Sequence, residues 1–182
     1  MLEKGLIDDQ AYGNGFGDFA KRSLPADWVI SAQNYFDRDL FKEAGIAFRK
    51  AKDERAARIA DAYALYQDAE KVPPRAKERI QAYADTATAF YRCALASANV
   101  GERAKFFSTA GKCFSKAAMY REAAGAYIRA FEYNEAASQY LLGQMLDEAI
   151  ALVMSYPVTD AELVDEIKSL GKYVYLSDHR LK

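Results

Sequence analysis

Three stretches, MYREAAGAY (119–127), EYNEAASQY (132–140) and MLDEAIALV (145–153), follow one another at a period of 13 residues. Each contains an apolar or aromatic residue, a polar residue, the pair Glu-Ala, and an aromatic or apolar residue four positions after that alanine. A unit of this length accommodates one helix of about 10 residues, roughly 15 Å long, and a tight turn. Helical units that recur in this way predict an α-solenoid, in which each helix buries one face against its neighbours.

An earlier segment, LFKEAGIAF (40–48), repeats the same pattern. A shift of 79 residues without gaps places Glu43, Ala44, Ala47, Phe48 and Ala51 on Glu122, Ala123, Ala126, Tyr127 and Ala130. Two other segments carry apolar residues at helical spacing: Phe107, Ala110, Phe114 and Ala117, and Leu146, Ala149, Ile150 and Val153. Residues at this spacing form one stripe along a helix, so large side chains are expected to pack against alanines of the adjacent helices.

The composition favours helices throughout the chain. Alanine, the best helix former, makes up about a fifth of the residues, and the only strand candidate is 173–176. We therefore predict an all-α fold, a TPR-like (tetratricopeptide-like) α-solenoid of stacked antiparallel helices that winds into a right-handed superhelix. The helices are expected at 26–36, 39–51, 53–71, 74–98, 102–117, 121–131, 134–142, 146–155 and 160–170.

Proline, glycine and capping residues set the expected boundaries. Pro25 opens the first helix, Pro74 starts another, and Gly101 separates two alanine-rich stretches. Thr159 has a glutamate three residues later, which is the spacing of a capping box. The predicted organisation is a loose lead-in at 1–22, a TPR-like helical-repeat domain at 23–170 and a C-terminal tail at 171–182.

The charge balance and the apolar runs exclude several classes of protein. Among 182 residues, 25 are Lys or Arg and 26 are Asp or Glu, which gives a formal net charge of -1. This balance removes the simplest electrostatic case for a nucleic-acid or membrane-surface protein. No apolar run is long enough for a membrane span and no targeting segment is visible, so we expect an intracellular protein and no membrane partner.

No residue combination points to catalysis. The glycines at 13–17 lack the preceding strand and the further glycine of a dinucleotide-binding loop. His179 is the only histidine, and Cys93 and Cys113 are expected to be buried thiols without a base. We therefore predict no catalytic, cofactor-binding or metal-binding residue, no cofactor, and no enzymatic activity of this chain.

The residues between 42 and 58 are the strongest candidate for a binding surface. Six basic residues stand there against three acidic ones, a local net charge near +3 that suits phosphates, although a solvated helix face is the simpler interpretation. Most tyrosines lie beside alanines at helical spacing and are expected in the core, but two of them are candidates for a concave surface. The predicted partner-binding residues are Arg49, Lys52, Arg55, Arg58, Tyr63 and Tyr66.

Two segments of the chain carry a family resemblance. The stretch SLPADWVISAQNYFDRDLFKEAGIAFRKAKDERAARIADAYAL (23–65) combines a Ser-x-Pro-x-x-Trp opening with an aromatic-rich helix pair and an alanine-rich helix. Together with REAAGAYIRAFEYNEAASQYLLGQMLDEAIALV (121–153), it resembles the TPR-like region of large fungal UvrD/Rep-type helicase-like proteins, relatives of the animal TPR and ankyrin repeat-containing protein. The likeness covers roughly 23–155.

The resemblance implies that this chain is a fragment or a stand-alone relative of a helicase-like protein and that it carries none of the helicase chemistry. In that family the ATPase motifs lie elsewhere in a much longer polypeptide, and this sequence contains none of them. We expect a non-catalytic protein-interaction scaffold, a fragment or relative of a helicase-like protein, that binds a protein, a peptide or another domain. The alternative is an accessory module for single-stranded nucleic acid. The family suggests the nucleus, and the residues alone are equally compatible with the cytoplasm.

Overall fold

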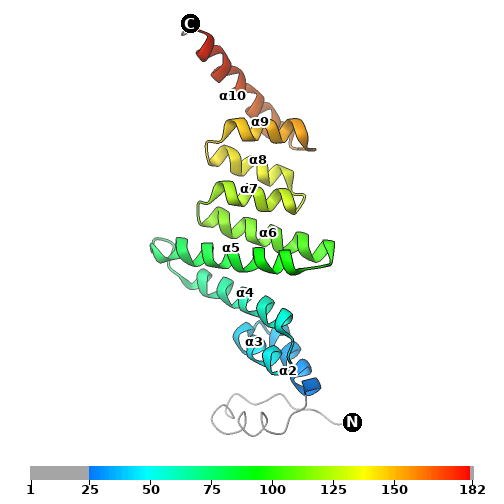
Figure 1. The fold of residues 1–182 in the computed structure, drawn as a ribbon. Helices are drawn as coiled ribbons and strands as arrows, with labels where there is room; N and C mark the ends of the chain where they lie inside the picture. The colour runs from blue at the N-terminus through cyan, green and yellow to red at the C-terminus, as the bar shows by residue number, and fades with distance from the viewer. Residues whose placement is uncertain (1–24, 181–182) are drawn as a thin grey trace. The chain divides into compact units, whose positions relative to one another are not determined.

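The regular structure is helical throughout the part of the chain that the computed structural model describes, residues 25–180 (Figure 1). These residues contain no strand, and consecutive helices pack against each other in a solenoid-like arrangement, so the all-α prediction is confirmed. The helices are α2 (Pro25–Asp37), α3 (Phe41–Lys50), α4 (Glu54–Lys71), α5 (Glu78–Ala96), α6 (Val100–Lys116), α7 (Tyr120–Arg129), α8 (Tyr133–Leu142), α9 (Leu146–Ser155) and α10 (Ala161–Arg180). The predicted lead-in (1–22), its glycine loop and the side chain of His179 lie outside the described residues.

The chain divides into two compact units, 1–61 and 62–182. In the first unit, α2 packs against α3, and both contribute to a core with the first half of α4. The ring of Phe36 meets the rings of Phe41 and Phe48 edge-on, with centroids 5.0 and 6.5 Å apart. The buried residues of this core are Trp28, Ala32, Ala44, Ala47, Phe48, Ala57 and Ala60. Small side chains let the helix backbones approach closely around two large aromatic groups.

In the second unit, the helices from α5 to α10 pack each against the next in chain order, in an antiparallel row (Figure 1). The second half of α4 joins this unit through Tyr63, whose ring contacts Phe90 of α5 edge-on at 5.0 Å. The predicted apolar stripe on α6 is buried along its whole length, from Phe107 to Ala117. The stripe on α9 is only partly buried, with Ala149 in the core and Leu146 and Val153 half-exposed.

The tight turns between the repeated helices share one backbone conformation. The second residue after the end of α2, α3, α6, α7 and α8 has a positive φ between 56 and 64°. The next residue donates its N–H to the carbonyl five positions earlier, as Glu132 does to Tyr127 at 2.9 Å. This is the Schellman motif, which satisfies the last carbonyls of a helix. The positive-φ residues are Asp39, Lys52, Ala118, Phe131 and Gln144. Within each run they stand 13 residues apart, so the period of the sequence is the period of the turns.

Replacement of one of these turn residues by glycine is expected to stabilise the protein. Ala118 is exposed and has a φ of 56°, where its Cβ crowds the neighbouring carbonyl. We expect Ala118→Gly to raise the free energy of unfolding by about 0.5–1 kcal/mol, measured by urea denaturation. The control is Ala151→Gly at an exposed site inside α9, which should lower the free energy of unfolding by about 1 kcal/mol. A loss of stability in both variants would contradict the role assigned to the turn.

Two helix starts differ from the prediction. Pro74 does not begin a helix, because residues 74–77 form turns and α5 starts at Glu78. Gly101 does not separate two helices either, since it lies in the first turn of α6. The separation falls at residues 97–99, where the Asn99 side chain accepts a hydrogen bond from the N–H of Glu102 at 2.9 Å. Asn99 is therefore the N-cap of α6.

The last helix corrects two further expectations. Its N-cap is Asp160, whose carboxylate accepts a hydrogen bond from the N–H of Leu163 at 3.1 Å, and not Thr159. Thr159 is instead held by Asn134, whose side chain accepts from the Thr159 N–H at 2.9 Å and donates to the Thr159 hydroxyl at 3.0 Å. The helix does not end at residue 170 but continues to Arg180, so the strand candidate at 173–176 is wrong. No helix of the described chain combines the length and hydrophobicity needed to cross a bilayer.

Candidate functional site

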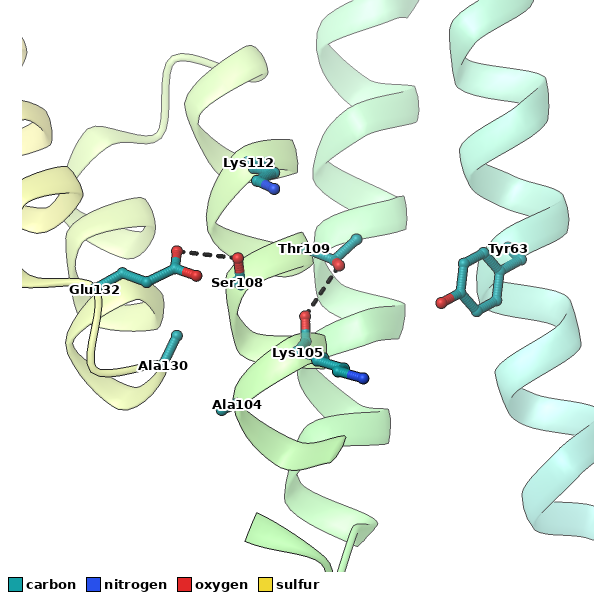
Figure 2. A pocket seen from close by; sticks show the side chains of 8 residues that line it. All are labelled: Tyr63, Ala104, Lys105, Ser108, Thr109, Lys112, Ala130 and Glu132. Atoms are coloured by element: carbon teal, nitrogen blue, oxygen red, sulfur yellow. Dashed lines mark hydrogen bonds between the residues drawn. The ribbon is translucent and has the colours of Figure 1, made fainter. Parts of the chain in front are cut away.

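A surface pocket of about 380 Å³ lies over α6 in the second unit. Its walls come from α4, from α6 and from the turn between α7 and α8 (Figure 2). The lining residues are Tyr63, Ala104, Lys105, Ser108, Thr109, Lys112, Ala130 and Glu132, which we call the α6 pocket. Segments far apart in the sequence therefore converge on one site.

One face of α6 forms the floor of the α6 pocket. Lys105, Ser108, Thr109 and Lys112 are spaced at i, i+3, i+4 and i+7, so they share a face of the helix. The apolar stripe that begins at Phe107 occupies the buried face. The Thr109 hydroxyl donates to the Lys105 carbonyl at 3.0 Å, as Figure 2 shows. Thr109 thus bonds its own helix, and the two lysines supply the positive charge of the site.

The turn between α7 and α8 forms one wall of the pocket. The turn is a Schellman motif in which Phe131 has a φ of 64°, and the residues before and after it, Ala130 and Glu132, line the pocket. The Ser108 hydroxyl donates to the Glu132 carboxylate at 2.9 Å, and this bond connects α6 to the turn (Figure 2). The carboxylate also helps to raise the pKa of the buried Tyr127 hydroxyl to about 12, after the larger effect of burial.

Tyr63 forms the opposite wall. Its ring packs edge-on against the fully buried Phe90, which fixes the ring on α4, and its side chain is half-buried. Burial raises the pKa of the Tyr63 hydroxyl, and the nearby Cys93 adds to this effect. The hydroxyl therefore stays protonated at neutral pH, when it can act as a hydrogen-bond donor.

The α6 pocket carries an excess of positive charge. Lys105 and Lys112 are exposed, and neither forms an ion pair with any carboxylate of the described residues. The single carboxylate of the lining is that of Glu132, which leaves a net charge of +1. Two unpaired ammonium groups beside hydroxyls and a half-buried tyrosine are suited to bind anionic groups.

A second polar cluster joins α4, α5 and α6. The Lys116 ammonium lies 2.5 Å from the Glu70 carboxylate and 3.3 Å from the Tyr83 hydroxyl, and it sits over the rings of Tyr66 and Tyr83. Arg79 donates to the Tyr83 hydroxyl at 3.0 Å. Each group of this cluster already has a partner, so we assign it a structural role in holding the three helices together.

The ion pair of this cluster makes stability depend on pH. Hydrogen bonds from Lys116 and Tyr83 lower the pKa of Glu70 from 4.5 to about 2. Because the folded pKa is lowered, the stabilisation is present above about pH 4.5 and is lost as the pH falls toward 2. Glu70→Gln should cost about 1 kcal/mol at pH 7, since the carboxylate is 39% exposed and its pairing is screened.

Urea denaturation of the wild type and Glu70→Gln across this pH range measures the effect. The difference between their free energies of unfolding should shrink toward zero by about pH 2. Glu166→Gln, at an exposed position of α10, is the matched control. A difference that stays constant with pH would refute the assigned pair.

Of the six residues that the sequence singled out, four belong to the first unit and two to the second. Tyr63 lines the α6 pocket, whereas Tyr66 packs against Phe90 at 6.5 Å and lies under Lys116. Of the four basic residues, all exposed, Arg49 pairs with Asp61 and Lys52 forms a positive-φ turn. The basic residues belong to the first unit, and they are Arg49, Lys52, Arg55 and Arg58.

The lysines of the pocket were missed by sequence reasoning, although a signal was present. Lys105 and Lys112 occupy the polar face of the same helix whose apolar stripe was recognised. Two lysines seven residues apart on such a face mark a basic edge. Their convergence with Tyr63 and Glu132 depends on the fold and has no signature in the sequence.

The two cysteines are buried, as predicted. Burial raises the pKa of the Cys113 thiol to about 12, so it is protonated and unreactive at neutral pH. In the described part of the chain, no group of three or more His, Cys, Asp or Glu side chains is placed to hold a metal ion.

Residues 25–180 therefore form stacked helices that carry a basic pocket lined by α4, α6 and the turn between α7 and α8. In comparisons with known proteins, no family model, no curated protein and no solved structure matches the chain.

Proposed function

We propose that this protein is a non-catalytic protein-interaction scaffold. The observation that carries the proposal is the α6 pocket, an open site formed by three segments and containing two lysines without ion pairs among the described residues. Ligand sites are concave and contain a few polar or charged groups that orient the ligand, and charge complementarity across an interface gives specificity.

The helical stack suits such a role because it supplies a preformed surface. The pocket rests on a core of aromatic and alanine side chains, and Schellman motifs fix the turns beside it. A site held in its binding conformation loses little conformational entropy when the partner binds. A short peptide can therefore reach useful affinity with few contacts.

The resemblance of 23–155 to the TPR-like region of fungal UvrD/Rep-type helicase-like proteins extends the proposal. In such a protein, the scaffold would hold a peptide segment or a neighbouring domain, and helicase activity would belong to other parts of the polypeptide. The resemblance supports a protein or peptide as the partner, and it supports no enzymatic activity of this chain because no catalytic residue of that family has a counterpart in this sequence.

The experiment that tests the proposal is a selection of random twelve-residue peptides displayed on phage against the full chain. Enriched peptides are then measured by fluorescence anisotropy with the wild type and with Lys105→Glu/Lys112→Glu. We expect micromolar binding to the wild type and at least tenfold weaker binding to the variant. Failure to enrich any sequence over several rounds would count against a peptide-binding scaffold.

A second candidate is an accessory module for single-stranded nucleic acid. The observation that favours it is the exposure of Arg49, Lys52, Arg55 and Arg58 in the first unit. A labelled single-stranded oligonucleotide titrated at two salt concentrations tests this function, because phosphate contacts weaken steeply with salt. Arg55→Glu/Arg58→Glu should abolish binding without lowering the melting temperature if this candidate is correct.

A further inference from the structure

We infer that the α6 pocket recognises acidic side chains of an extended peptide segment in the partner protein. The inference rests on the proposed scaffold function and names the chemistry of its ligand. Three features of the pocket carry it, namely its charge, the spacing of its two lysines, and the exposed apolar residues beside it.

The first feature is charge complementarity. The ammonium groups of Lys105 and Lys112 lack carboxylate partners in the described chain, while the Glu132 carboxylate is engaged by the Ser108 hydroxyl at 2.9 Å. The pocket therefore offers two positive charges and keeps its own carboxylate occupied. Charge-assisted hydrogen bonds from lysine to a carboxylate are stronger than neutral ones, and because both lysines are exposed, the attraction should weaken with salt.

The second feature is the spacing of the charges along α6. Seven residues separate Lys105 from Lys112, which corresponds to about 10.5 Å along a helix axis. A peptide in the extended polyproline II conformation rises about 3.1 Å per residue and has three residues per turn, so acidic residues three positions apart lie on the same side, about 9 Å apart, close to this distance. A peptide lying along α6 can thus place one carboxylate near each lysine.

The third feature is an apolar border. Val100 lies one helical turn before Ala104 on the same face of α6, and Phe131 stands between two lining residues. Both side chains are 62% exposed. Phe131 occupies the positive-φ position of the turn between α7 and α8, so this turn fixes the backbone of the residue beside the pocket. We assign these two residues to a contact with a large apolar side chain that flanks the acidic pair.

The same features disfavour nucleic acid in this pocket. A nucleic-acid strand presents a phosphate at every nucleotide, and binding gains from many basic contacts. Here a glutamate forms part of the wall and the lining carries a net charge of only +1. A peptide with two separated carboxylates fits this distribution better.

The test uses the full chain and three labelled probes in fluorescence anisotropy. The first is the peptide Gly-Ser-Leu-Asp-Ala-Ser-Glu-Ser-Gly, which has its two acidic residues three positions apart and a leucine beside them. The second carries Asn and Gln in place of Asp and Glu, and the third is a ten-nucleotide oligothymidine. We expect the acidic peptide to bind at least tenfold tighter than the amide peptide and to weaken with salt.

Charge reversal identifies the residues responsible. Lys105→Glu/Lys112→Glu should remove the preference for the acidic peptide, whereas Lys77→Glu/Lys168→Glu, the same charge change at exposed sites away from the pocket, should retain it. Circular dichroism melts of both variants check that the fold is kept. Val100→Ser, which removes one of the two apolar side chains beside the pocket, should weaken the binding of both peptides by the same factor.

Each other outcome overturns the inference in a distinguishable way. Equal affinity for the two peptides, or no binding of the acidic peptide at millimolar concentration, would show that the pocket does not recognise acidic side chains. The proposed scaffold function would then still be decided by the phage selection. Tighter binding of oligothymidine that is lost in Lys105→Glu/Lys112→Glu assigns the pocket to nucleic acid. Loss of the preference in the control variant would place the site elsewhere on the surface.

Discussion

Truncation of Phe90 to alanine is expected to lower the free energy of unfolding by about 3–5 kcal/mol. Phe90 is fully buried and contacts the rings of Tyr63 and Tyr66 edge-on, with centroids 5.0 and 6.5 Å away. Its ring also lies 6.2 Å from that of Phe106. Removal of the Phe90 ring leaves a cavity among three aromatic groups, and Tyr63 loses the ring that holds it in the wall of the α6 pocket. Both the free energy of unfolding and the affinity for peptide should therefore fall.

Urea denaturation followed by far-ultraviolet circular dichroism measures the change in stability. Phe131→Ala is the matched control, because the same side chain is removed from an exposed position and the loss should stay below about 0.5 kcal/mol. A cost below about 1 kcal/mol for Phe90→Ala would mean that this aromatic cluster is not the core of the second unit.

A leucine at Gly111 is expected to cost about 3 kcal/mol. An ideal Cβ at Gly111 would lie 3.0 Å from the ring carbons of Tyr127, so even a methyl group requires the tyrosine to shift and the larger leucine side chain has no room. The extra carbon atoms must separate the helices or displace a buried tyrosine. Both responses disturb the turn that carries Glu132 into the pocket.

The comparison with Gly125→Leu isolates the steric effect. Gly125 is also inside a helix, but a Cβ there would meet only the end of the Arg129 side chain, at 3.9 Å. Helix propensity favours leucine over glycine at both sites, so Gly125→Leu should stay within about 1 kcal/mol of the wild type. Equal losses in thermal or urea denaturation would show that close packing at Gly111 is not the cause.

The fold was accessible from the sequence because the repeat is local. The Glu-Ala pair marks the first turn of each repeated helix, and the alanine of the pair is fully buried at Ala44, Ala123, Ala136 and Ala149. An aromatic residue supplies the carbonyl that closes each Schellman turn, at Tyr35, Phe48, Phe114, Tyr127 and Tyr140. Both features recur at fixed spacing, so they could be recognised without knowledge of the three-dimensional structure.

The turns were harder to foresee because none of the five positive-φ positions is a glycine. The usual signal for a left-handed turn is therefore missing, and some of the glycines lie instead where two helices approach closely. At Gly171, a Cβ would lie 2.9 Å from the Ile150 side chain, so this glycine serves the packing of α10 against α9. The sequence prediction ended the last helix at residue 170, just before Gly171, but this glycine lies inside α10 and does not end it.

The site was less accessible than the fold. The basic stretch at 42–58 attracted attention because its charges are adjacent in the sequence, yet Arg49 there is paired with Asp61. The α6 pocket depends on residues from 63 to 132 whose proximity is created by helix stacking. Only Tyr63 was common to the predicted residues and the observed pocket.

Binding of a partner through the α6 pocket can be tested residue by residue. An amide chemical-shift titration of the ¹⁵N-labelled chain with the acidic nonapeptide locates the binding surface. We expect the largest shifts in 100–112 and 130–132, with small changes elsewhere. Largest shifts in 49–58, or no shifts at saturating peptide, would contradict binding at the α6 pocket.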